Sequence, residues 1–273
     1  MRVVFFDAYN LIHRARHSTP AYLRDSPDGM IFTFFRSFAA LWRTVQPDEA
    51  YFVIEGTPRR RLALLPEYKG TRVKAPDDGF IRQKNEIIDL LSSSFPVSVV
   101  QHPDYEADDV IAHLVTENAE SMPGCELVVV STDTDFLQLA NTPHNFVQYD
   151  PIKKKNKELP EFDYVRWKSL RGDSSDNIPG FKGIGDKRAH KLLESESALE
   201  KFLDTGDNRA MFERNIELIS FHDLKPRSRE INYSLAYPDW DNVHRVFTAK
   251  SFSSIVKEES WQKFVDSFRF GGN

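Results

Sequence analysis

Four short apolar runs, separated by segments of helix length, are the feature that most constrains the fold of this chain. The runs occupy residues 2–6, 51–54, 97–100 and 127–130. Continuous apolar runs of this length are typical of strands that are buried on both faces. Aromatic and aliphatic residues recur at helical spacing in the segments 32–45, 81–91 and 110–115. Strands that alternate with helices predict an α/β fold, with a central, mainly parallel sheet flanked by helices and joined by right-handed crossovers.

The character of the chain changes near residue 150. Strand signals fade there, and the remainder reads as helical segments interrupted by prolines. We expect an N-terminal α/β domain over residues 1–160 and a helical C-terminal region over residues 161–273. A helix suggested within residues 252–268 is expected to pack against the domain, with docking of a partner as the alternative.

Composition narrows the class of protein. Apolar residues make up 40% of the chain and charged residues 28%, and no run approaches the about 18 apolar residues of a membrane span. Asp7 interrupts the first apolar run before a signal peptide could develop, so we expect a cytoplasmic protein, or one in the host cytoplasm if it is phage-encoded. The single cysteine, Cys125, excludes an internal disulfide and a Cys-rich zinc site. We expect a monomer with no membrane partner.

Acidic residues follow each of the four expected strands. They are Asp7, Glu55, Glu106, Asp108, Asp109, Asp133 and Asp135. The carboxyl ends of parallel strands meet at one edge of a sheet, so these side chains should converge on one cleft. Two unit charges about 4 Å apart repel by roughly 4 kcal/mol at an effective dielectric constant near 20, and divalent cations would relieve that repulsion. A ligand set made only of oxygen indicates Mg²⁺ or Mn²⁺ rather than zinc.

Each of these acids also has an ordinary structural explanation. Asp7 could be a turn residue, and the acids of residues 106–109 could be favoured by the dipole of a helix that begins there. Coincidence is a poor explanation for all of them together. His13 and His17 stand four residues apart, as zinc ligands on a helix do, but no third ligand is in register.

The stretch of residues 172–187, GDSSDNIPGFKGIGDK, is the most specific part of the sequence. Asp173 and Asp176 are three residues apart, so on a helix both carboxylates would point the same way and could complete the metal cluster. Gly180, Gly183 and Gly185 would let the backbone approach a phosphate or a cation. A basic helix then opens at Lys187.

Basic residues occur in short blocks although the net charge is −5. The blocks are Arg59–Arg61; Lys69, Arg72 and Lys74; Lys153–Lys155 with Lys157; and Lys182, Lys187, Arg188 and Lys191. Any one block is more often a solvated surface than a binding surface. The nine candidate site acids account for more than the whole net negative charge. The rest of the surface is therefore mildly basic and suited to salt-sensitive, sequence-independent binding of phosphates.

Five sequence blocks, spread over most of residues 1–225, occur together in one known family. They are FDAYN at residues 6–10, PEYKGTR at 66–72, EADD at 106–109, STDTD at 131–135 and the hairpin from Asp173 to Gly185. In these blocks the chain resembles the 5′ nuclease superfamily, specifically the 5′ to 3′ exonuclease domain of bacterial DNA polymerase I and the stand-alone phage and bacterial flap endonucleases. The resemblance implies a PIN-like nuclease core, a helical arch over about residues 66–84, and a helix-hairpin-helix DNA-binding element over about residues 173–194.

The resemblance also implies a site with two Mg²⁺ ions, for which Mn²⁺ can substitute. The positions that match the family's ligands are Asp7, Glu55, Glu106 and Asp108 for one ion and Asp133, Asp135, Asp173 and Asp176 for the other, with Asp109 beside them. Lys69 and Arg72 match residues that contact the scissile phosphate, and Tyr68 matches one that stacks on a base. Gly180, Gly183 and Gly185, with Lys187, match the hairpin that grips duplex phosphates around a K⁺ ion.

The function implied by the resemblance is structure-specific hydrolysis of DNA in replication and repair. The expected substrates are a 5′ single-stranded flap or a 5′ end at a nick, gap or duplex junction, and the expected products carry a 5′-phosphate. One alternative is a 5′ to 3′ exonuclease of RNase H type that removes RNA primers. The others are a catalytically inactive DNA-binding paralogue, which should have lost acids, and a PIN-type ribonuclease, which needs neither arch nor hairpin. Glu55 departs from the family, where Asp is usual, so we expect a weaker ligand.

Overall fold

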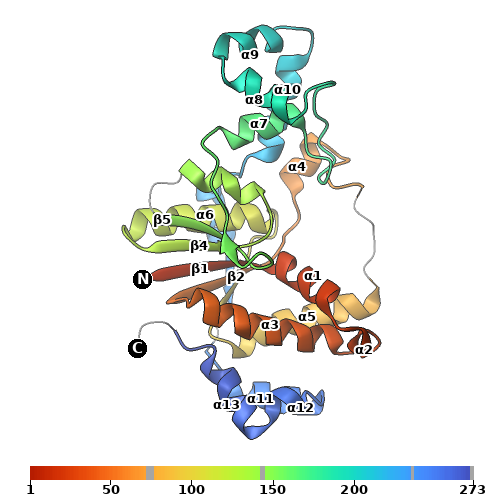
Figure 1. Ribbon diagram of the computed structural model, residues 1–273, viewed down its shortest axis with the longest axis vertical. Coiled ribbons are helices and arrows are strands. Elements are labelled where there is room, and N and C mark those ends of the chain that lie inside the picture. Colours follow the sequence, from red (N-terminus) through yellow and green to blue (C-terminus); the bar gives the residue numbers. More distant parts are fainter. Residues whose placement is uncertain (72–76, 142–144, 235–236, 271–273) are drawn as a thin grey trace.

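A seven-stranded sheet lies at the centre of the molecule in the computed structural model, which describes residues 1–71, 77–141, 145–234 and 237–270 (Figure 1). The strand order is β6-β5-β4-β1-β2-β3-β7. The strands are β1 Arg2–Asp7, β2 Glu49–Val53, β3 Ser98–Gln101, β4 Glu126–Val130, β5 Asn145–Asp150, β6 Lys155–Asn156 and β7 Asn232–Ser234. Strands β1 to β5 are parallel, and β6 and β7 add antiparallel edges. The prediction of a mainly parallel α/β sheet is confirmed.

Three strands were not predicted from the sequence. In β5 the residues alternate, so that Phe146, Gln148 and Asp150 are buried while the residues between them are more accessible. Such a strand lacks the continuous apolar run that identified the other parallel strands. The other two strands, β6 and β7, have only two and three residues. The pairing of β7 with β3 returns the chain from the helical region to the sheet.

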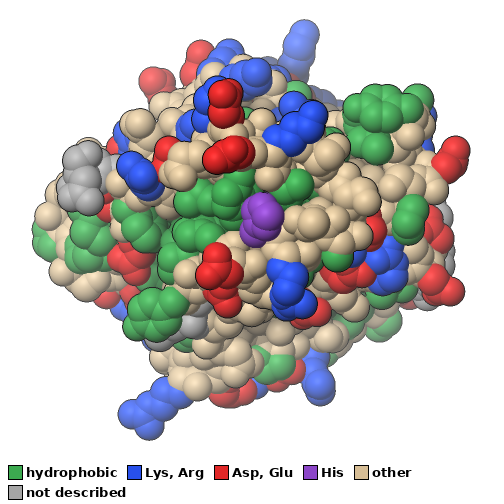
Figure 2. Space-filling model, turned by 90° about the horizontal axis from the view of Figure 1, so that it is seen from below, with side chains coloured by type: hydrophobic (Ala, Val, Ile, Leu, Met, Phe, Trp, Pro, Cys, Tyr) green, Lys and Arg blue, Asp and Glu red, His purple; other side chains and the backbone are tan. Residues whose placement is uncertain are grey.

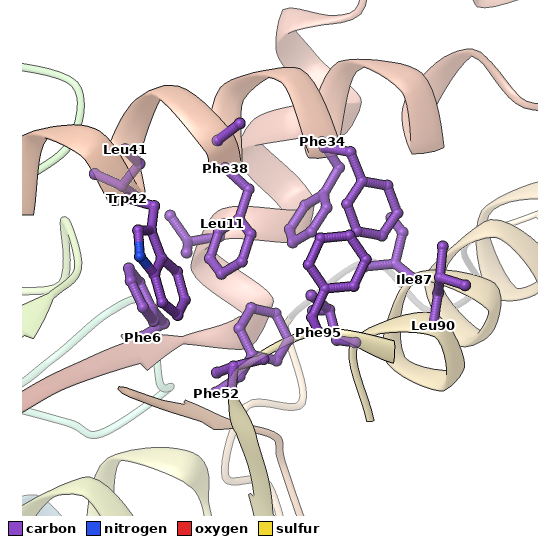
Figure 3. Packing of buried hydrophobic residues seen from close by; sticks show 14 of the residues in the cluster. Phe6, Leu11, Phe34, Phe38, Leu41, Trp42, Phe52, Ile87, Leu90 and Phe95 are labelled. Carbon is purple, nitrogen blue, oxygen red and sulfur yellow. The ribbon is translucent and has the colours of Figure 1, made fainter. Parts of the chain in front are cut away.

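Helices cover both faces of the sheet because successive residues of a buried strand point to opposite faces. In β1, Val4 and Phe6 enter one core, whereas Val3 and Phe5 enter the other. The first core is dominated by aromatic side chains of α3, among them Phe34, Phe38 and Trp42 (Figure 3). The helices of this part are α1 Ala8–Ser18, α2 Ala21–Arg24, α3 Gly29–Val45, α4 Arg59–Leu64, α5 Asp78–Ser94 and α6 Ala107–Ser121, with the 3₁₀ helices η1 Asp135–Asn141 and η2 Lys225–Glu230.

The C-terminal helices belong to the first core. Helices α11 Trp240–Ala249, α12 Ser253–Val256 and α13 Glu258–Asp266 lie below α3 and α5 in Figure 1. Phe247, Phe264 and Phe268 are at most 6% exposed and pack into the same cluster as the sheet residues. The predicted packing of residues 252–268 against the domain is therefore confirmed. Figure 2 shows this lower face, where apolar side chains lie between acidic and basic ones.

Four further helices form a separate layer above the sheet (Figure 1). They are α7 Tyr164–Arg171, α8 Asp186–Leu193, α9 Glu196–Leu203 and α10 Asn208–Ile219. This layer has a separate hydrophobic core, to which Leu170, Phe181 and Phe212 contribute. A hairpin joins α7 to α8, in which Gly180 lies so close to Arg171 that a Cβ there would meet the Arg171 carbonyl oxygen at 1.9 Å.

The predicted arch falls partly outside the described residues. Residues 66–71 form turns after α4, and α5 begins at Asp78. Residues 72–76, which include Arg72, lie outside the described part of the chain. Among the helices that are described, none has both the length and the hydrophobicity needed to cross a membrane.

Candidate metal centre

The acids at the strand ends line two adjoining cavities at the carboxyl edge of the sheet. A cavity of about 620 Å³ is lined by Asp7, Glu55, Asp108 and Asp133, together with Lys69. A second cavity, of about 730 Å³, is lined by Asp133, Asp135, Asp173 and Asp176. Because Asp133 belongs to both, the carboxylates form one continuous acidic surface. The role of each as a metal ligand remains a prediction.

Asp7 links the ends of β1 and β4. Its carboxylate caps α1 by accepting a hydrogen bond from the Asn10 backbone N–H at 3.2 Å, and it accepts another from the Ser131 hydroxyl at 2.7 Å. The Asn10 side chain in turn donates to the Thr132 hydroxyl at 2.6 Å. Burial raises the pKa of Asp7 to about 6 although both hydrogen bonds act in the opposite direction. This carboxylate is rigidly placed and its charge is costly there.

Glu55 and Asp108 extend the acidic surface from β2 and α6. The Glu55 carboxylate accepts a hydrogen bond from the Ala107 N–H at 3.1 Å, at the first turn of α6. Burial raises the pKa of Glu55 to about 7, and burial with the charges of Asp133 and Asp7 raises the pKa of Asp108 well above its ordinary value. A bound cation would remove this penalty.

Asp135, Asp173 and Asp176 form a second group. One carboxylate oxygen from each lies within 4.8 Å of the others. The Lys168 ammonium group contacts Asp135 and lies 2.6 Å from Asp173. Burial raises the pKa of Asp135 to about 6 despite that contact, whereas bonds from Lys168 and Ser175 outweigh burial and lower the pKa of Asp173.

The local structure of this second group differs from the sequence prediction. Asp173 and Asp176 were expected on a helix, and this was wrong. They lie in the hairpin after α7, where Asp173 forms an isolated β-bridge with Ile178. A tight turn nevertheless brings both carboxylates to the same side.

Glu106 is held by three side chains. Lys69 contacts one of its oxygens, and the other accepts from Arg61 at 2.7 Å and lies 3.0 Å from the Tyr68 hydroxyl. The Tyr68 hydroxyl is also 2.9 Å from Asp176, and Tyr68 as a whole is 5% exposed in a cluster with Ile178, Leu218 and Ile219. Stacking of Tyr68 on a base remains a prediction, and in this structure the side chain is buried.

Asp109 has a different environment from the other acids. It is fully buried, and both of its oxygens accept hydrogen bonds from Arg61, at 2.5 and 2.8 Å. It also accepts from the His222 N–H at 2.9 Å and caps the start of α6 with Glu106. These contacts favour a structural role for Asp109 over the predicted place beside the ions.

The donor set fits hard divalent cations. The candidate ligands are carboxylate oxygens alone, and burial opposes the charge of four of these carboxylates, Asp7, Glu55, Asp108 and Asp135. Two ammonium groups, those of Lys69 and Lys168, already lie between carboxylates of the cluster. The two lysines offset part of the negative charge, and the oxygen-only donor set suits divalent cations.

The predicted hairpin residues lie in the helical layer. Gly183 has a left-handed backbone, with φ at 77°, and its carbonyl accepts a hydrogen bond from Arg188 at 3.0 Å. Gly185 caps α8, and Lys187 is exposed in the first turn of that helix. Their contact with duplex phosphates, and a K⁺ ion among them, remain predictions.

Sequence reasoning missed several residues that support the site. Lys168 lies on α7, five residues before Asp173. This short separation from Asp173 is the only feature of the sequence that could have pointed to a role in the site. The sequence identifies Arg61 only as a member of the basic block Arg59–Arg61. Lys157 likewise belongs to a basic block of the sequence. Its ammonium group donates hydrogen bonds to the backbone carbonyls of Thr132 and Asp133, at 2.7 and 3.0 Å.

An acid-rich carboxyl edge on a parallel sheet, next to a separate helical layer, is consistent with the class of metal-dependent nucleases. Comparison with protein families agrees with this class. Residues 2–166 match the 5′-3′ exonuclease N-terminal resolvase-like domain, and residues 159–232 match the 5′-3′ exonuclease C-terminal SAM fold. The chain belongs to the 5′-3′ exonuclease family, and the family recognised from the sequence blocks is confirmed.

Individual relatives support this assignment. DNA polymerase I of Bacillus subtilis is 30% identical over 247 residues, which cover 84% of this chain but 27% of that protein. The chain thus spans under a third of the length of that curated relative. The crystal structure of the T5 D15 protein co-crystallised with metal ions has a TM-score of 0.64 at 18% identity, covering 98% of both chains. The catalytic core of Rad2 in complex with a DNA substrate has a TM-score of 0.57 at 15% identity, covering 98% of this chain and 92% of that one. Both of these structures share the fold of this chain.

Proposed function

We propose that this chain is a structure-specific 5′ nuclease that hydrolyses phosphodiester bonds in flapped, nicked or gapped DNA and leaves 5′-phosphate ends. One observation carries the proposal. Carboxylates from four strand ends and from the α7–α8 hairpin converge on one edge, with Lys69 and Lys168 among them. Membership of the 5′-3′ exonuclease family supports this proposal.

Two groups of acids would hold two Mg²⁺ ions, as the family resemblance predicts. The first comprises Asp7, Glu55, Glu106 and Asp108, and the second Asp133, Asp135, Asp173 and Asp176. The position of Asp133 between the two cavities supports ions close enough to act on one phosphate. When bound, such ions lower the pKa of water and neutralise charge on the phosphate oxygens.

Lys69 is the residue of this chain best placed to act on the phosphate. Its ammonium group lies at the edge of the first cavity and is paired with Glu106 and Asp176. Once cations neutralise those carboxylates, the ammonium group can turn to a phosphate oxygen, where it stabilises the negative charge that develops during cleavage. Tyr68 and Arg61 hold Glu106 in position from the buried side.

The helical layer would bind the duplex. Lys182, Lys187 and Arg188 are exposed on the hairpin and on the first turn of α8. Backbone amides at a helix N-terminus and nearby cations bind phosphates without reading bases. Recognition would then depend on the shape of a branched or interrupted duplex.

A cleavage assay on three substrates tests the proposal. A 5′-labelled flap, a nicked duplex and an RNA-primed duplex are incubated with Mg²⁺ and the wild-type protein, the Asp133→Asn variant or the Asp241→Asn variant. Asp241 is exposed on α11, far from the cleft, and serves as the matched control. We expect cleavage by wild type and Asp241→Asn, and a loss of at least a hundredfold in Asp133→Asn.

The pattern of cleavage also separates the alternatives. Preference for the RNA-primed duplex would identify a primer-removing exonuclease. Tight binding by wild type without cleavage of any substrate would identify an inactive DNA-binding paralogue. Near-normal turnover of Asp133→Asn would overturn the metal assignment.

A further inference from the structure

We propose that the tip of the β5–β6 hairpin is a separate contact for the phosphodiester backbone of the DNA strand that enters the acidic cleft. The inference rests on the proposed function for the identity of its partner. It concerns the lysine block of residues 153–155, which lies outside the metal centre, the arch and the α7–α8 hairpin. Three observations support it: a fixed turn, unpaired cations, and a position at the rim of the cleft.

The turn at the tip has a fixed shape. Asp150, the last residue of β5, is 4% exposed, and its Oδ1 accepts hydrogen bonds from the backbone N–H groups of Ile152 and Lys153, both at 2.9 Å. The backbone at Lys154 is left-handed, with φ at 54°. Residues 155 and 156 then pair with 150 and 149. The lysines are therefore presented by an ordered turn, which lowers the entropy lost when a ligand binds.

The lysines at the tip lack counter-charges. Lys153, Lys154 and Lys155 are exposed, and their ammonium groups form neither an ion pair nor a hydrogen bond with any other residue in the described ranges. Some exposed basic residues elsewhere are paired, as Arg60 is with Glu217 and Lys225 is with Glu120. Three adjacent positive charges repel one another, and an anionic partner would relieve that repulsion.

The tip lies at the rim of the acidic cleft. Ile152 is 64% exposed and lines the same cavity as Asp7 and Asp133. Tyr9 and Arg14 of α1 line it as well. A DNA strand with one phosphate at the carboxylates would thus pass between α1 and the hairpin tip. The lysines of the tip would then be within reach of its backbone. Cations beside aromatic side chains are typical of surfaces that bind single strands.

The hairpin is also joined to the metal centre. Lys157 donates to the carbonyls of Thr132 and Asp133, and Gln148 of β5 donates to the Ser131 carbonyl at 3.1 Å and to that of Asp133. The same element that presents the cations therefore supports the loop that carries Asp133. For this reason Lys157 is left unchanged in the test.

A binding experiment at several salt concentrations tests the inference. Affinity for a fluorescent 5′-flap DNA is measured in Ca²⁺ for wild type, for Lys153→Gln/Lys154→Gln, and for Lys257→Gln/Lys263→Gln. The last variant removes two exposed charges at α13 and the residue before it, and α13 lies below α3 and α5 in Figure 1. For the hairpin variant we expect a salt dependence shallower by about 1.5 in log–log slope and an affinity loss of about tenfold near 0.1 M salt. Unfolding curves check that both variants are folded.

The possible outcomes separate this inference from the proposed function. An unchanged affinity and slope in the hairpin variant, with active wild type, would overturn the hairpin contact and leave the nuclease proposal intact. An equal loss in both double variants would also overturn it, because only overall charge would then matter. Failure of wild type to bind or cleave any DNA would overturn both.

Discussion

Arg61 and Asp109 form a fully buried, two-bonded ion pair directly behind Glu106, with Nη1–Oδ2 at 2.5 Å and Nη2–Oδ1 at 2.8 Å. Arg61 also donates to Glu106 and to the carbonyls of Leu218 and Ser220. All five N–H groups of its guanidinium are thereby used. This side chain joins α4 and the start of α6 to the end of α10, so α4, the candidate metal centre and the helical layer share one support.

Replacing the two neighbouring acids of α6 should have opposite effects on stability. Asp109→Ala leaves the Arg61 charge buried with its main partner removed, and should cost about 3–5 kcal/mol of unfolding free energy. Asp108→Asn removes a charge that burial and neighbouring carboxylates disfavour, so the metal-free protein should become more stable above neutral pH while cleavage is lost. Urea unfolding in EDTA measures both. Equal destabilisation by the two variants would contradict the distinct roles.

The stability of the metal-free protein should fall as pH rises through the range of about 4 to 7. Burial raises the folded-state pKa of Asp7 and Asp135 to about 6 and that of Glu55 to about 7, so the folded protein binds protons more tightly than the unfolded chain. The stabilisation from these protons is complete below the ordinary carboxyl pKa and is lost above the raised values.

Mg²⁺ should therefore stabilise the protein more at pH 8 than at pH 5, since the ligands must be ionised to bind it. Thermal melting in EDTA and in Mg²⁺ across this pH range measures the difference. A Mg²⁺-induced rise in Tm that is the same at pH 5 and pH 8 would contradict the assignment of these acids as ligands.

Lys69 and Lys187 should affect different steps. Lys69→Ala should lower the single-turnover cleavage rate far more than DNA affinity, because a cation beside the scissile phosphate matters most as charge develops. Lys187→Ala should lower affinity and its salt dependence more than the rate, because it removes a phosphate contact made before cleavage. Single-turnover kinetics with a flap substrate separates the two effects. The same pattern in both variants would show that arch and hairpin do not divide these roles.

Glu55→Gln should raise the Mg²⁺ concentration needed for half-maximal rate, with partial rescue by Mn²⁺. The substitution keeps the size of the side chain and removes its charge, while the amide oxygen can still accept the hydrogen bond from the Ala107 N–H. A titration of the cleavage rate with each metal provides the measurement. Unchanged metal dependence would exclude Glu55 as a ligand, and a loss as complete as that of Asp133→Asn would make it an indispensable one.

The sequence by itself was sufficient for the parallel sheet and for the convergence of the acids. Four mainly apolar runs predict β1 to β4, and the topology of parallel strands places their carboxyl ends at one edge. The sequence alone therefore predicts that Asp7 and Asp133 lie close together. These predictions depend only on apolar patterns in short segments and on the rule that parallel strands have their carboxyl ends at the same edge of a sheet.

Only the tertiary structure decided which partner each charged or aromatic group has. Arg61 meets Asp109 across 48 positions of sequence and Leu218 across 157, and Tyr68 reaches Asp176 across 108. Burial of the Tyr68 ring, the role of Asp109 and the contact of Lys168 with two carboxylates all depend on such pairs. No local pattern encodes them, because a hydrogen bond or an ion pair is set by the distance between atoms, which the packing of whole elements fixes.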